Sequence, residues 1–196
     1  MDIRASIESI RTKIVSIPHK ILIALIRPLL VFAIICIVSG MFLQFNKPWL
    51  VTDNFMSELL KPNDLILVSK QAYSNRDIRF GDVVLHYAGS VDSEGGYVQY
   101  CNRVIGMPGD EIEIKDARII RNGVRMDEPY VLGEHTFGEM DAIIVPAGCY
   151  FVLGDNRFLS IDSRDDRVGL VTRDQIQGKV VFRLLPVSRA GDISLE

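Results

Sequence analysis

Hydrophobic residues follow two different patterns along this chain. Residues 21–45 are almost wholly apolar, and residues 29–38 carry no charge, as expected of an α-helix that crosses the ~30 Å hydrocarbon layer of a bilayer. After Trp49 the apolar residues come in short or alternating runs, which are typical of β-strands. We therefore predict one membrane-spanning helix followed by a mainly β domain.

Five short apolar runs predict strands, at residues 65–68, 82–86, 97–105, 111–114 and 149–153. Asn122-Gly123 lies between two further runs, 118–121 and 124–126, and both residues tolerate the positive φ angles of a type I′ hairpin turn. The sheet is therefore expected to be mainly antiparallel. Loops or short turns are expected where polar residues gather, at 89–96, 133–141 and 172–177.

Charged residues beside the apolar segment indicate its orientation. Only Lys47 lies close behind the segment, whereas five basic residues precede its fully apolar stretch from Leu29: Arg4, Arg11, Lys13, Lys20 and Arg27. Because short segments rich in Lys and Arg stay in the cytoplasm, we expect a single-pass protein of the cell membrane with a cytoplasmic N-terminus. Residues 1–20 are then cytoplasmic, 21–45 form the anchor, and 46–196 form an extracytoplasmic domain. A cleaved signal peptide and a buried core helix are the alternatives.

The first residues have an amphipathic spacing of isoleucines, at positions 3, 7, 10, 14 and 17. This spacing predicts a short helix at the membrane interface, with a solvated tail as the alternative.

Composition excludes several functions. The net charge of -3, from 22 basic and 25 acidic residues, provides no basic surface for nucleic acid. The three cysteines have no C-x-x-C spacing, so neither a zinc site nor a disulfide scaffold is indicated, and no metal or cofactor is expected. Pairing of Cys101 with Cys149 stays open.

Four segments, in order, resemble the motif boxes of type I signal peptidases. Gly154-Asp-Asn-Arg157 followed by Ser160-Ile-Asp-Ser-Arg164 is similar to the family's G-D-N-R-x-x-S-x-D-S-R. Asn102-Arg-Val-Ile-Gly-Met-Pro-Gly-Asp110 resembles K-R-V-I-G-x-P-G-D, and Phe80-Gly-Asp-Val-Val84 resembles R-G-D-I-V. Residues 51–68 align without a gap with V-x-G-x-S-M-x-P-T-L-x-x-G-D-x-V-L-V. The resemblance implies a signal-peptidase-like antiparallel domain after the anchor.

The same alignment places Phe55 at the family's serine nucleophile and Asn102 at its lysine base. Phenylalanine has no nucleophilic atom, and an asparagine amide is not basic near neutral pH. By analogy with serine proteases, losing both groups costs on the order of a millionfold in turnover. Asp53 would oppose the negative charge that develops on the substrate oxygen. Met56 matches the family, whereas Glu58 and Leu59 replace its proline and threonine.

Ser57 is the fallback nucleophile. In an extended segment it lies ~6.5 Å from the aligned position, beyond hydrogen-bond reach of a fixed base, and a surface turn residue is the expected reading. His86 and His135 do not align with the base. Eleven residues are expected to have structural roles around the former site: Asp53, Met56, Arg103, Gly154, Asp155, Asn156, Arg157, Ser160, Asp162, Ser163 and Arg164.

The resemblance extends to dyad-lacking members of this family that are associated with pilus assembly in Gram-positive bacteria. It implies an inactive, membrane-anchored protein that holds exported polypeptides, with pilin subunits or sortase-associated machinery as partners. Two other functions stay open. One is an active type I signal peptidase with a rearranged site, or an enzyme whose two residues were replaced deliberately. The other is a structural or inhibitory partner of an active signal peptidase.

Overall fold

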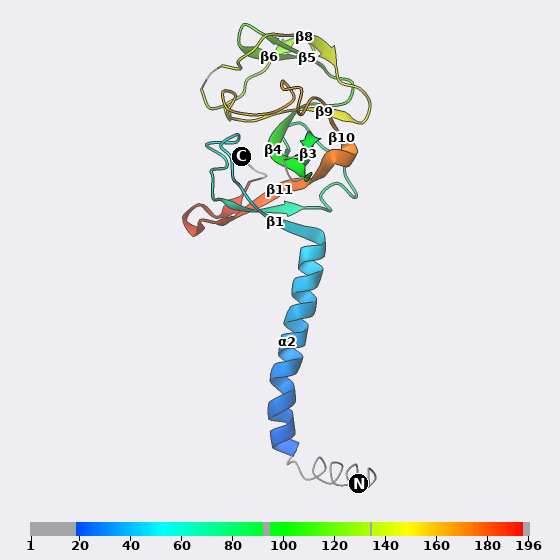
Figure 1. Cartoon of the computed structure of the whole chain (residues 1–196), viewed down its shortest axis with the longest axis vertical. Coiled ribbons are helices and arrows are strands. Elements are labelled where there is room, and N and C mark those ends of the chain that lie inside the picture. The colour runs from blue at the N-terminus through cyan, green and yellow to red at the C-terminus, as the bar shows by residue number, and fades with distance from the viewer. Residues whose placement is uncertain (1–18, 92–94, 134, 194–196) are drawn as a thin grey trace. The chain divides into compact units, whose positions relative to one another are not determined.

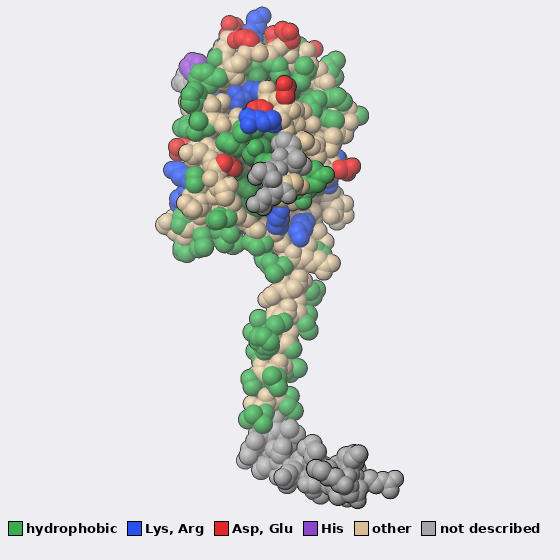
Figure 2. All heavy atoms as spheres, viewed as in Figure 1, with side chains coloured by type: hydrophobic (Ala, Val, Ile, Leu, Met, Phe, Trp, Pro, Cys, Tyr) green, Lys and Arg blue, Asp and Glu red, His purple; other side chains and the backbone are tan. Residues whose placement is uncertain are grey.

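The computed structural model describes residues 19–91, 95–133 and 135–193. Helix α2 runs from His19 to Phe45 and contains Pro28. Within it, Ile23–Phe45 is long and apolar enough to cross a membrane and is not buried by the protein, and hydrophobic side chains are visible along it in Figure 2. These properties fit a membrane anchor. The isoleucines at positions 3–17 lie outside the described residues.

The remainder of the described chain, from Phe45 onward, is a separate compact unit built of β-strands (Figure 1). Its larger sheet has eight strands in the order β1-β2-β11-β3-β4-β9-β10, with β12 also on β11. These strands are β1 (Asn46–Leu50), β2 (Leu65–Ser69), β3 (Val83–Val91), β4 (Tyr97–Gly106), β9 (Cys149–Leu153), β10 (Val171–Thr172), β11 (Ile176–Leu185) and β12 (Gly191–Asp192). Every pairing is antiparallel. The predicted class, mainly β after one N-terminal helix, is confirmed.

A second sheet of four strands has the order β7-β6-β5-β8. Its members are β5 (Glu111–Lys115), β6 (Arg118–Arg121), β7 (Val124–Arg125) and β8 (Met140–Ile144), and Figure 1 shows β5, β6 and β8 gathered at one end of the β domain. Asn122 and Gly123 have φ angles of 54° and 75°, so the predicted hairpin turn is confirmed. Buried Ile112, Phe151 and Leu153 join this sheet to β9 of the larger one.

Several strands differ from the prediction, and β8, β10 and β12 are not among the predicted runs. Strand β3 continues to Val91, and β8 begins at Met140, so parts of both predicted polar loops are strand. Strand β1 was not predicted, because its sequence Asn-Lys-Pro-Trp-Leu shows no alternation of apolar residues. Pairing with β2 makes β1 a strand, and its Pro48 is tolerated because β1 lies at the edge of the sheet.

Candidate functional site

Phe55 lies in the loop of turns between β1 and β2. Its backbone N–H donates to Oδ1 of Asp53 (3.1 Å), and its carbonyl oxygen accepts from the N–H of Asn156 (2.9 Å). Its half-buried ring packs on Tyr100 of β4, with 5.5 Å between the ring centroids. The phenyl group is therefore part of the packing between this loop and the large sheet.

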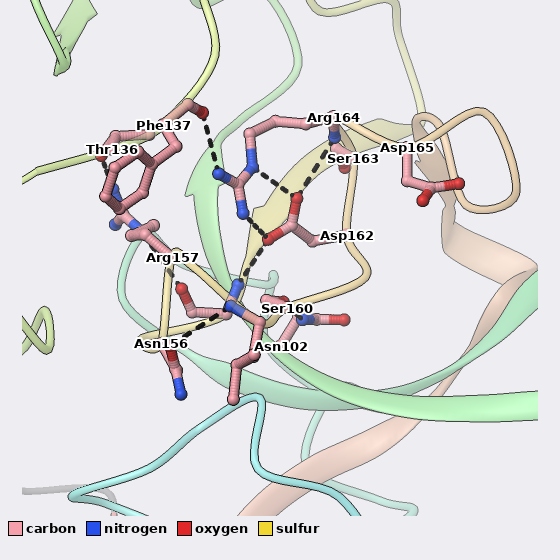
Figure 3. Close-up of polar contacts among 12 residues, drawn as sticks. Asn102, Thr136, Phe137, Asn156, Arg157, Ser160, Asp162, Ser163, Arg164 and Asp165 are labelled. Carbon is pink, nitrogen blue, oxygen red and sulfur yellow. Dashed lines mark hydrogen bonds and ion pairs between the residues drawn. The ribbon is translucent and has the colours of Figure 1, made fainter.

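Asn102 is fully buried on β4. Its side chain lies between two polar groups from other segments: Oδ1 is 2.8 Å from Nε2 of His86 on β3, and Nδ2 is 3.2 Å from Oγ of Ser160. His86 is also fully buried, and its Nδ1 is 3.1 Å from the carbonyl oxygen of Tyr87. A continuous chain of hydrogen bonds thus runs from His86 through Asn102 to Ser160; Figure 3 shows its Asn102–Ser160 end.

The protonation of His86 decides how the Asn102 amide is oriented. Burial lowers the pKa of His86, so the ring is neutral at pH 7. Because the Tyr87 carbonyl only accepts, Nδ1 carries the proton and Nε2 must accept. The amide NH₂ of Asn102 therefore belongs on the His86 side and its oxygen on the Ser160 side, since the two ends of an amide have nearly the same shape. In this arrangement no group at position 102 takes up a proton.

The two aligned dyad positions meet at Gly154. A Cβ atom there would lie closer than 3.0 Å to the Ser160 side chain and to the carbonyl oxygen of Phe55. Ser160 bonds to Asn102, so the 154–160 turn contacts the side chain of Asn102 and the backbone of Phe55 together. The fold therefore brings residues 47 positions apart to one place, as the gapless alignment requires.

The sequence suggested that Ser57 is a surface turn residue, and this prediction is wrong. It is only 9% exposed, its hydroxyl donates to the carbonyl oxygen of Asn54 (2.7 Å), and its oxygen accepts from Nδ2 of Asn156 (3.0 Å). These two bonds tie the loop to the 154–160 turn. None of the residues bonded to Ser57 is a base, so its hydroxyl is in a structural position.

The place where the loop around Phe55 meets Asn102 and the 154–160 turn is called the junction below. Asp53 lies next to it, with a half-buried side chain. Burial raises its pKa, and hydrogen bonds from backbone N–H groups, that of Phe55 first, oppose the shift. These bonds occupy the carboxylate within the loop. A negative charge held beside position 55 is unfavourable for any reaction that develops an oxyanion there.

Ion pairs with little exposed surface lie around the junction, and Figure 3 shows the one between Arg164 and Asp162. Arg103 donates two hydrogen bonds to Asp155 (2.9 and 2.6 Å), and its guanidinium carbon lies 4.3 Å from the centroid of the Tyr130 ring. Arg164 donates two bonds to Asp162 (both 2.8 Å), whose Oδ2 also accepts from the N–H of Gly154 (3.1 Å). These contacts hold the turn in place by charge-assisted bonds.

Three further contacts complete the surroundings of the turn. Arg157 pairs with Glu128 (2.6 Å) and donates to Thr136, and Ser163 Oγ accepts from the N–H of Val152 (2.9 Å). The N–H of Asp155 lies 3.4 Å from the sulfur of Met56. The eleven residues expected around the site thus contact one another or their immediate neighbours.

Several side chains that bond to residues of the site were not identified from the sequence. His86 could have been found from strand pairing, because β3 and β4 place His86 opposite Tyr100 and therefore diagonal to Asn102 on the same face. Glu128 and Thr136 gave no signal, because they lie in irregular segments. Cys101 and Cys149 are both free thiols, so they do not pair, and the residues described contain no cluster of His, Cys, Asp and Glu that could hold a metal ion.

The family profile, the relatives and the solved structure that this chain resembles are all described as signal peptidases. The profile of the family described as "Signal peptidase, peptidase S26" matches residues 22–185. Signal peptidase I of Bacillus caldolyticus is 35% identical over 168 residues, which cover 79% of this chain and 88% of that protein. Signal peptidase IB of Staphylococcus aureus (strain COL) is 34% identical over 172 residues, covering 79% and 85%. A crystal structure of a signal peptidase I from Enterococcus faecalis V583 aligns with a TM-score of 0.44 and 26% identity, over 54% of this chain and 97% of that one.

Proposed function

The chain belongs to the signal peptidase family, peptidase S26, and on that premise we propose that it binds exported polypeptides at the membrane without cleaving them. One observation carries the proposal. Phe55 offers no nucleophile, and Asn102, where a lysine base is expected, is joined to neutral His86 and to Ser160. Serine–lysine catalysis needs a hydroxyl and a neutral amine in contact, and this junction holds the Ser160 hydroxyl but no amine.

Binding does not depend on the two missing groups. Proteins of this kind can take up an extended chain by adding it to a sheet edge, where main-chain hydrogen bonds supply affinity. The junction around Phe55 is held by ion pairs that do not involve the dyad positions. In our proposal the exported chain binds in a cleft next to position 55, which Phe55 and Tyr100 alter without removing it. The clients are secreted subunits such as pilins, together with sortase-associated machinery.

The proposed location follows from the anchor and its flanking charges. Helix α2 inserts in the cell membrane, residues 1–20 face the cytoplasm, and the domain from residue 46 onward faces outward, where exported chains emerge. The basic residues before the span support this orientation.

The second candidate function is an active type I signal peptidase with a rearranged site. It is favoured by the names of the relatives, which are signal peptidases. Its remaining nucleophile is Ser57, whose hydroxyl bonds to Asn54 and Asn156.

A combined binding and cleavage assay separates the two. The full chain in detergent is mixed with one preprotein that carries a small-x-small site, beside Phe55→Ala, Ser57→Ala and the double variant Phe55→Ser/Asn102→Lys. We expect the wild type to bind the preprotein and to cleave no faster than Phe55→Ala, because the junction has no base. Cleavage by the wild type that disappears in Ser57→Ala would establish the second function. Absence of binding would refute the first.

The double variant measures how much of the cleft survives. Any cleavage by Phe55→Ser/Asn102→Lys alone means that the scaffold still presents a signal peptide correctly. Because Asp53 opposes oxyanion charge, we expect the further change Asp53→Gly to increase that rate by at least tenfold.

A further inference from the structure

A second feature of the domain shares Arg103, Tyr130 and Asp155 with the contacts described above. It is a cavity of about 440 Å³ that opens next to Glu58 and Leu59, three and four residues after Phe55. Its other walls come from Arg103, Asp155 and the segment 129–133, which precedes β8. A volume of this size lies within the ~300–1,000 Å³ range of sites that bind small ligands or single side chains.

The inner end of the cavity is neutral and its polar groups are paired. Arg103 and Asp155 are both buried there and form the ion pair described above. The backbone oxygen of Asp155 accepts from the N–H of Leu132 (2.9 Å). Among the described residues the only buried side-chain atom without a hydrogen-bond partner is Nε2 of Gln177, which is not in this cavity. At this inner end a polar ligand would therefore find no unpaired buried side chain to bind.

The walls, in contrast, are apolar. Leu59, Pro129, Tyr130 and Leu132 face the space, and Leu132 remains 43% exposed at its rim. Such walls gain free energy when an apolar group displaces water from them.

The rim carries one negative charge. Glu58 is exposed, with a positive φ of 82°, and no cation in the described part of the chain forms an ion pair with its side chain. Glu58 and Leu59, which replace the proline and threonine of the signal peptidase pattern, are thus both at the mouth of the cavity. Charge complementarity favours an occupant with a basic residue next to its apolar group.

We propose that this cavity binds one large apolar side chain, such as Leu or Phe, of the exported polypeptide, with an adjacent Lys or Arg paired to Glu58. The inference rests on the proposed function, because the occupant is the chain held at the Phe55 junction. It adds a selection rule: the protein prefers clients that carry an apolar–basic pair a few residues from the segment bound at Phe55.

The test uses the full chain in detergent micelles and fluorescein-labelled peptides followed by fluorescence anisotropy. Each peptide has Ala-Ser-Ala followed by an alanine–serine tract, in which a Leu-Lys pair is moved by one position at a time. We expect one register to bind about tenfold more tightly than the peptide without the pair, because a buried leucine side chain contributes that much or more. Changing its Lys to Glu weakens binding by a few-fold, and Glu58→Lys reverses that preference.

Two exposed apolar residues supply a matched pair of variants. Leu132→Asp places a charge at the rim, whereas Val124→Asp changes a residue that is 65% exposed in the β6–β7 hairpin and does not line the cavity. We expect the register-specific gain to disappear in Leu132→Asp and to persist in Val124→Asp.

Three results would contradict either the cavity subsite alone or the proposed holding function as well. If the peptides bind but no register gains from the Leu-Lys pair, the cavity is not a subsite while the proposed holding function stands. A gain that survives Leu132→Asp, or is lost equally in Val124→Asp, also excludes the cavity. If neither these peptides nor the preprotein binds the wild type, the proposed function fails together with the selection rule.

Discussion

Replacing Arg103 by Met tests whether the ion pairs around the junction support the fold independently of chemistry. Arg103→Met keeps most of the side-chain volume but removes the charge that faces Asp155. The two side chains are only 4% and 1% exposed, so Asp155 would be left as a buried carboxylate without its cation.

The expected loss of stability is large. Breaking a buried pair by removing one partner costs about 3–5 kcal/mol, and the cation–π contact with Tyr130, at 4.3 Å, adds about 1 kcal/mol. We expect Arg103→Met to lower the free energy of unfolding by about 4 kcal/mol at pH 7, a roughly thousandfold change in the folded-to-unfolded ratio. Replacing both residues, as Arg103→Met/Asp155→Leu, removes the uncompensated charge and should recover most of the loss.

The loss should also depend on pH. Burial raises the pKa of Asp155, and the hydrogen bonds from Arg103 oppose that shift. Without Arg103 the pKa in the folded variant rises further above its unfolded value of about 3.9. The folded variant then binds a proton that the unfolded chain does not, so its stability increases as pH falls. The difference from the wild type is therefore smaller at pH 5 than at pH 7.

The assay is urea unfolding of the full chain in detergent, followed by the fluorescence of Trp49. This is the single tryptophan, and it packs against the buried core of the domain. Arg125→Met, at an exposed position of β7, is the control and should change stability by less than about 0.5 kcal/mol. A loss below 1 kcal/mol in Arg103→Met, or a double variant as unstable as the single one, would refute the structural role.

Three other predictions concern the same junction. Gly154→Ala places a methyl group against Ser160 and the Phe55 carbonyl and should cost about 1–3 kcal/mol, whereas Gly191→Ala meets nothing within 4 Å and should be nearly neutral; equal effects in urea unfolding would contradict this packing. Because burial lowers the pKa of His86, the unfolded chain takes up a proton below about pH 6.5 that the folded one does not. The free energy of unfolding of the wild type should therefore decrease as the pH is lowered below about 6.5, and it should decrease less in His86→Gln. The variant at the exposed His135, His135→Gln, should show the same pH dependence as the wild type. Ser57→Ala should lose about 1 kcal/mol with no change in preprotein binding, and a loss of binding would assign Ser57 to the cleft.

Local patterns predicted those parts of the fold that depend on neighbouring residues. The hairpin at Asn122-Gly123 follows from the backbone preferences of two adjacent residues. The apolar run predicted helix α2 to within two residues of its start, because a long, almost wholly apolar segment has few alternatives. Strand β1 was missed, since only its pairing with β2 makes it extended.

The junction, too, could be predicted from the sequence only in part. The sequence alone established which side chains occupy the aligned positions, Phe55 and Asn102, and therefore that serine–lysine chemistry has no groups to use there. Which side chains bond to Asn102, the residue at the lysine position, was decided only by tertiary structure. His86 and Ser160 reach Asn102 from 16 and 58 residues away, through the register of β3 on β4 and the path of the 154–160 turn.

The sequence by itself thus determined the long apolar helix, the strand-rich domain, the family resemblance and the residues at the two dyad positions, because each depends on composition or on short-range order. Tertiary structure decided that Ser57 is buried, that Asn102 is hydrogen-bonded to His86 and Ser160, and that Glu58 and Leu59 open onto a cavity. Those features arise where segments distant in sequence pack together. Burial, pKa and open volume are properties of that packing, and no local pattern encodes them.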